Sequence, residues 1–352
     1  MSSSLRCAWL LSLLCLGCSS PLETVFSVSG DAPSRSGLAA VGEGAVFGNE
    51  AGRVLRLGPS GAVLWTAELA HEVRQTPAVV GDWVVVATTG GDLVGLDAAT
   101  GARSWRSEVP RPGAALAFFG SHVYLLSEEG ELLCLEASSG APLLRLSLAA
   151  ALGVHPGGPG RLALAAAPDE RLLVAGPAAV LAVGADGVRR WRTAAHEPYG
   201  LLVWEGLVWT VESSGRVLAL DLQTGEVQWQ RALGAAPASA PAHALDRLWV
   251  GLQNQTLVGF RLRDEGPLWT AQVPGLVTAP VVEFQGRLLT PTSGREGRLL
   301  ALEVGAPGNP PSARLDSPLR TSPLVRGATA WVLAQDGRVV GFRLRSVAGS
   351  AR

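Results

Sequence analysis

The sequence repeats itself with a period of about 41 residues, and this repetition constrains the fold more than any other feature. The stretch GDLVGLDAATGARSW, which starts at Gly91, returns as GRVLALDLQTGEVQW from Gly215. Eight copies fill the chain, because the same outline opens at Gly52, Gly91, Gly130, about Pro177, Gly215, about Gln255, Gly297 and Gly337. A repeat of this length indicates stacked supersecondary units.

Each copy contains four short apolar or alternating runs, which predict four strands. In the second copy these runs are 76–80, 82–88, 92–97 and 102–109. Glycines between the runs supply the positive φ that tight hairpins need. Four strands per copy at this period predict an all-β fold, an eight-bladed β-propeller of four-stranded antiparallel blades.

The last copy ends without a fourth strand and without the tryptophan that follows the turn in most copies. The N-terminal stretch ETVFSVSG, residues 23–30, alternates like a strand. We therefore predict that it closes the ring as the missing outer strand, with Phe26 in the vacant tryptophan position. The predicted division is a lipoprotein signal peptide at 1–18, a tether and ring-closing strand at 19–36, and the propeller at 37–352.

A small residue recurs four positions after the start of the third strand in most copies. We predict from this that backbones of neighbouring blades approach closely at that position. The residues are Gly95, Cys134, Ala219, Gly259, Ala301 and Gly341.

The first eighteen residues, MSSSLRCAWLLSLLCLGC, predict an export signal, since one arginine precedes an apolar run too short to span a bilayer. Their end resembles a bacterial lipobox, which implies lipidation of Cys18. Ser19 then implies outer-membrane sorting, with the periplasmic side favoured over the cell surface. Ordinary secretion after cleavage nearby remains the alternative. Only Cys134 lies outside this segment, so a disulfide framework is excluded.

Charge excludes one class of partner. The chain has 29 basic and 30 acidic residues, and every basic residue is an arginine. No dense arginine run occurs, whereas nucleic-acid binding needs a concentrated positive surface. Membrane contact is therefore expected through the lipid anchor alone.

The repeat resembles the pyrroloquinoline-quinone-type (PQQ-like) propeller repeat at Asp97, Thr100, Gly101 and Trp105, and again from Asp221 to Trp229. Some members of that family are quinoprotein dehydrogenases with a quinone and calcium at the ring axis. Here the aspartates occupy a turn position and the tryptophans a packing position. We predict no catalytic residue, no cofactor and no metal site.

The signal type, blade number and size are similar to those of the propeller lipoproteins of the outer-membrane β-barrel assembly machinery. This resemblance implies a non-catalytic, lipid-anchored periplasmic scaffold that binds a protein partner, which could be a barrel-assembly subunit, and assists outer-membrane protein assembly. Two alternatives stay open: a PQQ-dependent quinoprotein dehydrogenase, and a surface-displayed ligand-binding or adhesin propeller.

Longer and more varied connections are expected on one face of the ring, where the blade-to-blade loops meet the turns between second and third strands. Loops held by a rigid scaffold commonly carry recognition. We predict that partner binding involves Arg74, Arg111, Glu197, Tyr199 and Arg320.

Overall fold

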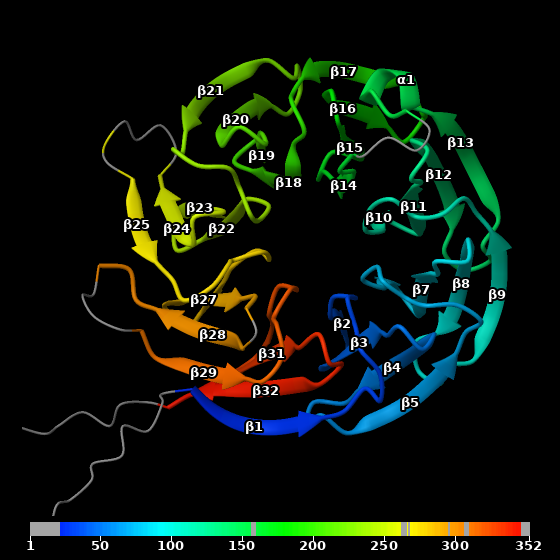
Figure 1. The fold of residues 1–352 in the computed structure, drawn as a ribbon. Helices are drawn as coiled ribbons and strands as arrows, with labels where there is room; N and C mark the ends of the chain where they lie inside the picture. The colour runs from blue at the N-terminus through cyan, green and yellow to red at the C-terminus, as the bar shows by residue number, and fades with distance from the viewer. Residues whose placement is uncertain are drawn as a thin grey trace, which may run out of the picture.

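The computed structural model describes residues 22–155, 160–261, 266, 268–294, 296–305 and 310–345. Eight four-stranded antiparallel sheets are arranged around a ring (Figure 1). This confirms the predicted eight-bladed propeller. The described part of the chain has one short helix, α1 (Ala149–Leu152), in the loop between the third and fourth blades. No helix among the described residues is long and apolar enough to cross a membrane.

The first four blades each take four consecutive strands, from the ring axis outward. Their bounds are β2 (Ala39–Val41), β3 (Gly44–Gly48), β4 (Arg53–Leu57) and β5 (Val63–Glu68); β6 (Ala78–Val80), β7 (Trp83–Ala87), β8 (Asp92–Asp97) and β9 (Arg103–Glu108); β10 (Ala117–Phe119), β11 (His122–Leu126), β12 (Glu131–Glu136) and β13 (Pro142–Ser147); β14 (Ala163–Ala166), β15 (Arg171–Gly176), β16 (Ala179–Gly184) and β17 (Arg189–Ala194).

The fifth to seventh blades follow the same plan, and the eighth takes its fourth strand from the N-terminus. Their bounds are β18 (Tyr199–Trp204), β19 (Leu207–Val211), β20 (Arg216–Asp221) and β21 (Val227–Ala232); β22 (Ala242–Ala244), β23 (Arg247–Gly251), β24 (Thr256–Phe260) and β25 (Trp269–Gln272); β26 (Val282–Phe284), β27 (Arg287–Thr292), β28 (Gly297–Leu302) and β29 (Ser312–Leu315); β30 (Leu324–Arg326), β31 (Thr329–Leu333), β32 (Val339–Leu344) and β1 (Leu22–Val28).

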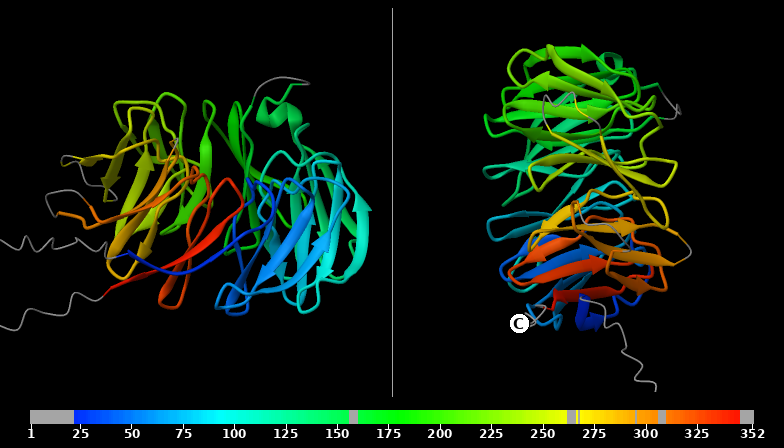
Figure 2. Two further views of the ribbon diagram at one scale, coloured as in Figure 1. Left: turned by 60° about the horizontal axis from the view of Figure 1, so that its bottom comes forward. Right: turned by 90° about the vertical axis from the view of Figure 1, so that its left-hand side faces the viewer.

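Strand β1 closes the ring, as predicted. It pairs antiparallel with β32, from Leu22 opposite Leu344 to Val28 opposite Val339. Phe26 stands opposite Gly341, which is the register that a tryptophan has in other blades. Figure 2 shows the blue first strand beside the red last strand.

The hydrophobic core lies between blades and not at the ring axis. Buried residues form eight clusters, and each cluster joins the facing sides of two neighbouring blades. The eight innermost strands also contact one another in a closed circle. Each blade therefore buries both faces of its sheet, which explains the nearly continuous apolar runs of the middle strands.

Where an outer strand carries a tryptophan, that ring connects its blade to the next, as Trp65 and Trp105 show. The indole N–H of Trp65 donates to the carbonyl of Ala98 (3.0 Å), and that of Trp105 donates to Ala137 (2.9 Å). The turn glycine of the next blade lies against the ring: a Cβ on Gly101 would be 2.7 Å from Trp65. Packing between blades is therefore the role of these rings, as predicted.

The small residue of the third strand has a different role from the predicted one. Gly95 pairs with Trp105 of its own blade, and a Cβ on Gly95 would lie 2.1 Å from that indole. Gly341 has the same relation to Phe26. The small side chain makes room for the large ring on the adjacent strand of the same blade, so the prediction of close backbones between blades was wrong.

A β-bulge precedes the tryptophan position in six of the outer strands and leaves one residue out of register. The six bulge residues are Val25, Leu64, Ser104, Leu143, Arg190 and Gln228. In the sixth blade the spacing from Gly266 to Trp269 is one residue shorter, and the described ladder from Trp269 to Gln272 has no register shift.

Candidate partner-binding face

The two faces of the ring differ in the connections that they carry. We call loop face the side with the blade-to-blade loops and the turns between second and third strands, and turn face the opposite side. Backbone hydrogen bonds join loop to turn on the loop face: Thr89 N–H donates to the Glu72 carbonyl and Glu128 N–H to the Arg111 carbonyl, both at 2.9 Å. The same bond recurs from Glu50 to Pro33, from Gln253 to Ala236 and from Gln335 to Pro318. These bonds hold the longer loops against the rigid blades.

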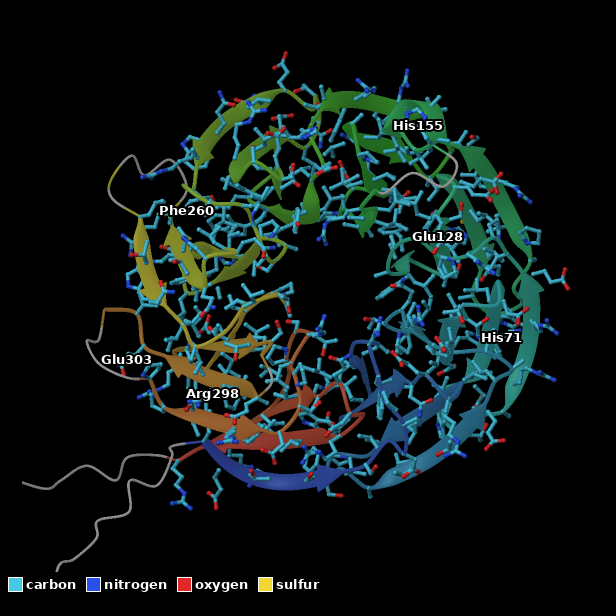
Figure 3. The ribbon with its side chains drawn as sticks, viewed as in Figure 1. His71, Glu128, His155, Phe260, Arg298 and Glu303 are labelled. Carbon is cyan, nitrogen blue, oxygen red and sulfur yellow. The ribbon has the colours of Figure 1, made fainter. Side chains whose placement is uncertain are left out.

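Two adjoining hollows on the loop face form what we call the loop-face groove. The larger, of about 1110 Å³, lies over the second to fourth blades, and the smaller, of about 460 Å³, lies beside it. Arg74, Thr89 and Arg111 line both. Figure 3 shows His71, Glu128 and His155, which also line the groove, in the same sector of the ring.

The groove carries both signs of charge together with apolar surface. Arg74 makes an ion pair with Glu72 (2.7 Å), whereas the Arg111 side chain is exposed and makes no ion pair with any residue that the structure describes. Glu128, Glu129 and Glu131 contribute carboxylates. Val154 and Leu162 add apolar side chains to the lining. Such a mixture suits a polypeptide surface better than a purely anionic or purely apolar ligand.

The five predicted partner-binding residues do not form one cluster. The structure brings Arg74 and Arg111 together in the groove. Glu197 lies in the loop before β18 and Tyr199 is the first residue of β18, where the Arg161 guanidinium lies 3.9 Å from the centre of the Tyr199 ring. Arg320 is exposed in the loop before β30, and the eighth and first blades separate it from Arg74. Their role in binding stays a prediction.

The acidic residues of the groove were missed by the sequence reasoning. Glu128 and Glu129 lie in the turn between β11 and β12, and Glu131 is the first residue of β12; all three belong to the run SEEGE of the sequence. The predicted binding residues came only from blade-to-blade loops, whereas the turns between second and third strands share the same face.

Glu212 is a buried carboxylate that fixes the loop before β18. It is 2 % exposed and accepts hydrogen bonds from the His196 backbone N–H (2.9 Å) and from Arg216 Nε (2.7 Å). Burial by itself raises the pKa of Glu212, but the bonds from Arg216 and His196 outweigh it, so the pKa lies below its ordinary value. No sequence signal distinguishes this glutamate from an exposed one.

The recurring aspartates of the repeat are turn residues, as predicted. Asp97 Oδ1 accepts hydrogen bonds from the Thr100 hydroxyl (2.8 Å) and from the backbone N–H groups of Ala99 and Thr100. The hydroxyl bond is the main reason that the pKa of Asp97 is lowered. Asp221 has the equivalent bonds from Gln223 and Thr224, and the backbone bond from Thr224 contributes most to lowering its pKa.

The described residues were compared with the requirements of a metal site and of a reactive thiol. Among them, no group of three or more His, Cys, Asp or Glu side chains is placed to hold a metal ion. Cys134 is buried, and burial raises the pKa of its thiol. It occupies the small-residue position opposite Leu144, which fills the tryptophan position of the third blade.

Comparison with known proteins identifies the family of the chain. Residues 21–117 and 107–248 match the family described as outer membrane protein assembly factor BamB. The chain belongs to this family. The outer membrane protein assembly factor BamB of Bordetella pertussis is 25 % identical over 296 residues, which cover 77 % of this chain and 74 % of that protein.

Solved structures show the same fold at low sequence identity. The crystal structure of BamB from Moraxella catarrhalis matches with a TM-score of 0.75 at 18 % identity, over 94 % of this chain and 99 % of that one. Quinohemoprotein alcohol dehydrogenase from Comamonas testosteroni matches with a TM-score of 0.70 at 13 % identity, over 95 % of this chain and 78 % of that one. Both likenesses concern the fold alone.

Proposed function

We propose that this protein is a non-catalytic, lipid-anchored periplasmic scaffold that assists the assembly of outer-membrane proteins. Membership of the family described as outer membrane protein assembly factor BamB supports this role. The aspartates of the repeat, which could be mistaken for catalytic carboxylates, are engaged in turns. The recurring aspartates and tryptophans of the repeat serve turns and packing, and the loops that differ between copies are available for recognition.

The observation that carries the proposal is the loop-face groove. Its loops are hydrogen-bonded to the turns beside them, so a partner meets a preformed surface and loses little free energy in ordering it. Arg111 presents an exposed guanidinium, and Arg74 lies beside it in the lining. Arginine is enriched among the residues that dominate binding energy at protein interfaces. We assign the groove to the protein partner, an assembly subunit of the outer membrane.

The lipid anchor is part of the proposal. Cys18 lies outside the described residues, and the resemblance of residues 14–18 to a lipobox supports its acylation. Acyl chains on this cysteine place the propeller at the outer membrane on the periplasmic side. Intact-mass measurement of the protein purified from its native envelope tests the acylation, with Cys18→Ser as the control.

The partner is tested by affinity purification in mild detergent from the native envelope, followed by mass spectrometry. The variant Arg74→Glu/Arg111→Glu reverses the charges of the two groove arginines. The control variant Arg103→Glu/Arg189→Glu makes the same change on exposed residues of β9 and β17. We expect the groove variant to lose at least about tenfold of the recovered partner, since charge reversal in an interface costs several kcal/mol. The control variant should recover as much partner as the parent protein, and the melting temperatures of both variants should equal that of the parent. Equal recovery of partner by the two variants contradicts partner binding in the groove.

The remaining predicted residues are tested one at a time in the same assay. Glu197→Ala and Arg320→Ala measure how far the partner extends around the loop face. Tyr199→Ala also removes the ring beneath Arg161, so its melting temperature must be measured beside its binding. Partner recovery that is unchanged in all three limits the footprint to the groove.

The same preparation separates the scaffold from a PQQ-dependent dehydrogenase. Quinone and calcium are assayed in the purified protein, and dye-linked alcohol oxidation is measured after addition of both. We expect neither bound quinone nor turnover. Stoichiometric quinone with turnover, and no recovered partner, overturns the scaffold in favour of the enzyme.

A further inference from the structure

Two neighbouring blades carry exposed apolar bulge residues beside the place where the chain enters the ring. Val25 is the bulge residue of β1 in the eighth blade, and Leu64 is the bulge residue of β5 in the first. They are 41 % and 55 % exposed, and Val63, next to Leu64, is 44 % exposed. The second, fourth and fifth blades have polar bulge residues instead, Ser104, Arg190 and Gln228.

The chain enters the ring on the turn face. Leu22 pairs with Leu344 at the end of β32, whereas Gly30, beyond the other end of β1, donates to the carbonyl of Gly337 in a turn of the loop face. Outer strands start at the turn face, so Val25, Val63 and Leu64 all lie toward that side of the rim.

The start of β1 is firmly held. Leu22 is 5 % exposed and belongs to the cluster that contains Phe284 and Phe342. Beside it, Glu23 makes an ion pair with Arg345 at 3.4 Å. The chain is therefore held in the ring from Leu22 onward, along the whole of β1.

Cys18 precedes Leu22 by only four residues. However they are arranged, four residues span at most about 14 Å. If Cys18 is acylated, as the proposed function holds, the turn-face rim of the eighth blade cannot move further than this from the membrane surface. The anchor thus restricts orientation as well as location.

We propose that the turn-face rim of the eighth and first blades rests on the lipid bilayer, with Val25, Val63 and Leu64 in its interfacial region and the loop-face groove directed away from the membrane. Apolar side chains gain free energy by leaving water at that boundary. Leu143 has the same bulge position and is 54 % exposed, but it lies two blades away from the first and three from the eighth. It is expected to stay in water.

Leu64 and Leu143 form a matched pair for the test. The chain contains no lysine, so Leu64→Lys and Leu143→Lys each introduce one side-chain amine. The acylated protein is labelled in detergent with an amine-reactive, environment-sensitive fluorophore and reconstituted into vesicles of phosphatidylcholine and phosphatidylglycerol that contain nitroxide-labelled lipid. Quenching by the nitroxide reports contact with the bilayer.

We expect the fluorophore at position 64 to be quenched at least about fivefold more strongly than that at position 143. Insertion of twenty glycine and serine residues after Pro21 should reduce quenching at position 64 to the level at 143, because the longer tether releases the rim. Equal quenching at the two positions with the natural tether overturns the proposal. Strong quenching at 64 that survives the insertion supports the contact with the bilayer and shows that the apolar side chains of the rim, and not the short tether, maintain it.

Absence of the lipid anchor can be distinguished from absence of contact between the rim and the bilayer. If the purified protein carries no acyl chains and does not float with vesicles, the anchor in the proposed function is wrong. The rim is then tested with the chain from Cys18 onward coupled through its Cys18 thiol to a maleimide phospholipid in the same vesicles. The expected and contrary quenching patterns are the same.

Discussion

The second and eighth blades build the same sheet from different material. The second blade is continuous in the chain, with a short turn that starts at Asp97 and an outer strand that carries Trp105. The eighth blade joins three C-terminal strands to β1, which comes from the other end of the chain and carries Phe26. No covalent turn connects β32 to β1. Comparing the two blades therefore shows which features of the outer strand the sheet needs, and which, such as the turn and the tryptophan, it can lack.

The comparison shows that the outer-strand position requires a large ring above a small residue. Phe26 lies over Gly341 as Trp105 lies over Gly95. It also contacts the turn glycine of the first blade, Gly61, as Trp65 contacts Gly101. What Phe26 lacks is the indole N–H, which in Trp105 bonds to the next blade. The hydrogen bond is an addition to a packing arrangement that works without it.

Closure of the ring depends on one nonlocal contact, the pairing of β1 with β32 from the opposite end of the chain. In the second blade, the outer strand stays beside its neighbour even when packing is weakened, because a short turn holds it. In the eighth blade, only hydrogen bonds and side chains hold β1 against β32, and closing such a long loop is costly in entropy. Loss of β1 also exposes the edge of β32 and one face of Gly341.

Removal of residues 22–28 is expected to have the largest effect. Without β1 the eighth blade has three strands, and the cluster around Phe284 and Phe342 loses Leu22. We expect the cooperative thermal transition, followed by circular dichroism, to be lost or to fall by more than about 15 °C, since several kcal/mol of packing and pairing disappear together. A peptide of residues 22–30 added in trans should restore part of it. A truncated protein that melts like the parent contradicts closure by β1.

Phe26→Ala and Trp105→Ala compare the two rings directly. Each removes a partly buried aromatic side chain from between two blades, and each should lower the free energy of unfolding by about 3 kcal/mol. Trp105→Phe retains the ring and loses one hydrogen bond, so about 1 kcal/mol is expected. Urea denaturation measures all three. If Phe26→Ala costs far less than Trp105→Ala, the two rings do not have equivalent roles.

The glycines beneath these rings are the next test. A Cβ on Gly95 would lie 2.1 Å from Trp105, and one on Gly341 would lie 2.3 Å from Phe26. The fourth and fifth blades have Ala182 and Ala219 at this position, so rings can shift to admit a methyl group. Gly95→Ala and Gly341→Ala should each cost about 1 to 2 kcal/mol, the usual range for overpacking. Ala219→Gly is the reciprocal control, and a gain of stability in either glycine variant would contradict the close fit.

The sequence predicted the fold well because its signals recur in each blade. The turn glycines, the tryptophan position and the alternation of the strands gave eight blades and the closing role of residues 23–30. The position of the small residue was found as well, but its neighbour was assigned wrongly. Spacing along the chain does not reveal whether Gly95 faces the next blade or its own Trp105, because that depends on the pairing register of two strands.

The loop face was predicted less completely because it is where the copies differ. Arg74 and Arg111 were found in loops of adjacent blades, and the structure brings them into one groove. Glu128 and Glu131 were not predicted because they lie in, and directly after, a turn that is short in every copy. Burial of Glu212 could not be predicted either, since its partners Arg216 and the His196 N–H meet it only in the folded ring.

The smallest expected effect concerns the turn that the eighth blade lacks. Asp97→Ala removes the acceptor for three hydrogen bonds on an exposed turn, so a small fall in melting temperature is expected near pH 7. The folded-state pKa of Asp97 is lowered, so its carboxylate stabilises the fold above the unfolded pKa, about 3.9, and this contribution is lost as the pH falls through the folded pKa. The difference between the variant and the parent should therefore shrink in acid, while the difference caused by Phe26→Ala persists as long as the ring is folded. Thermal melts of both variants between pH 7 and pH 3 measure this contrast, and an Asp97→Ala effect that is independent of pH contradicts a role for the charged carboxylate in the turn.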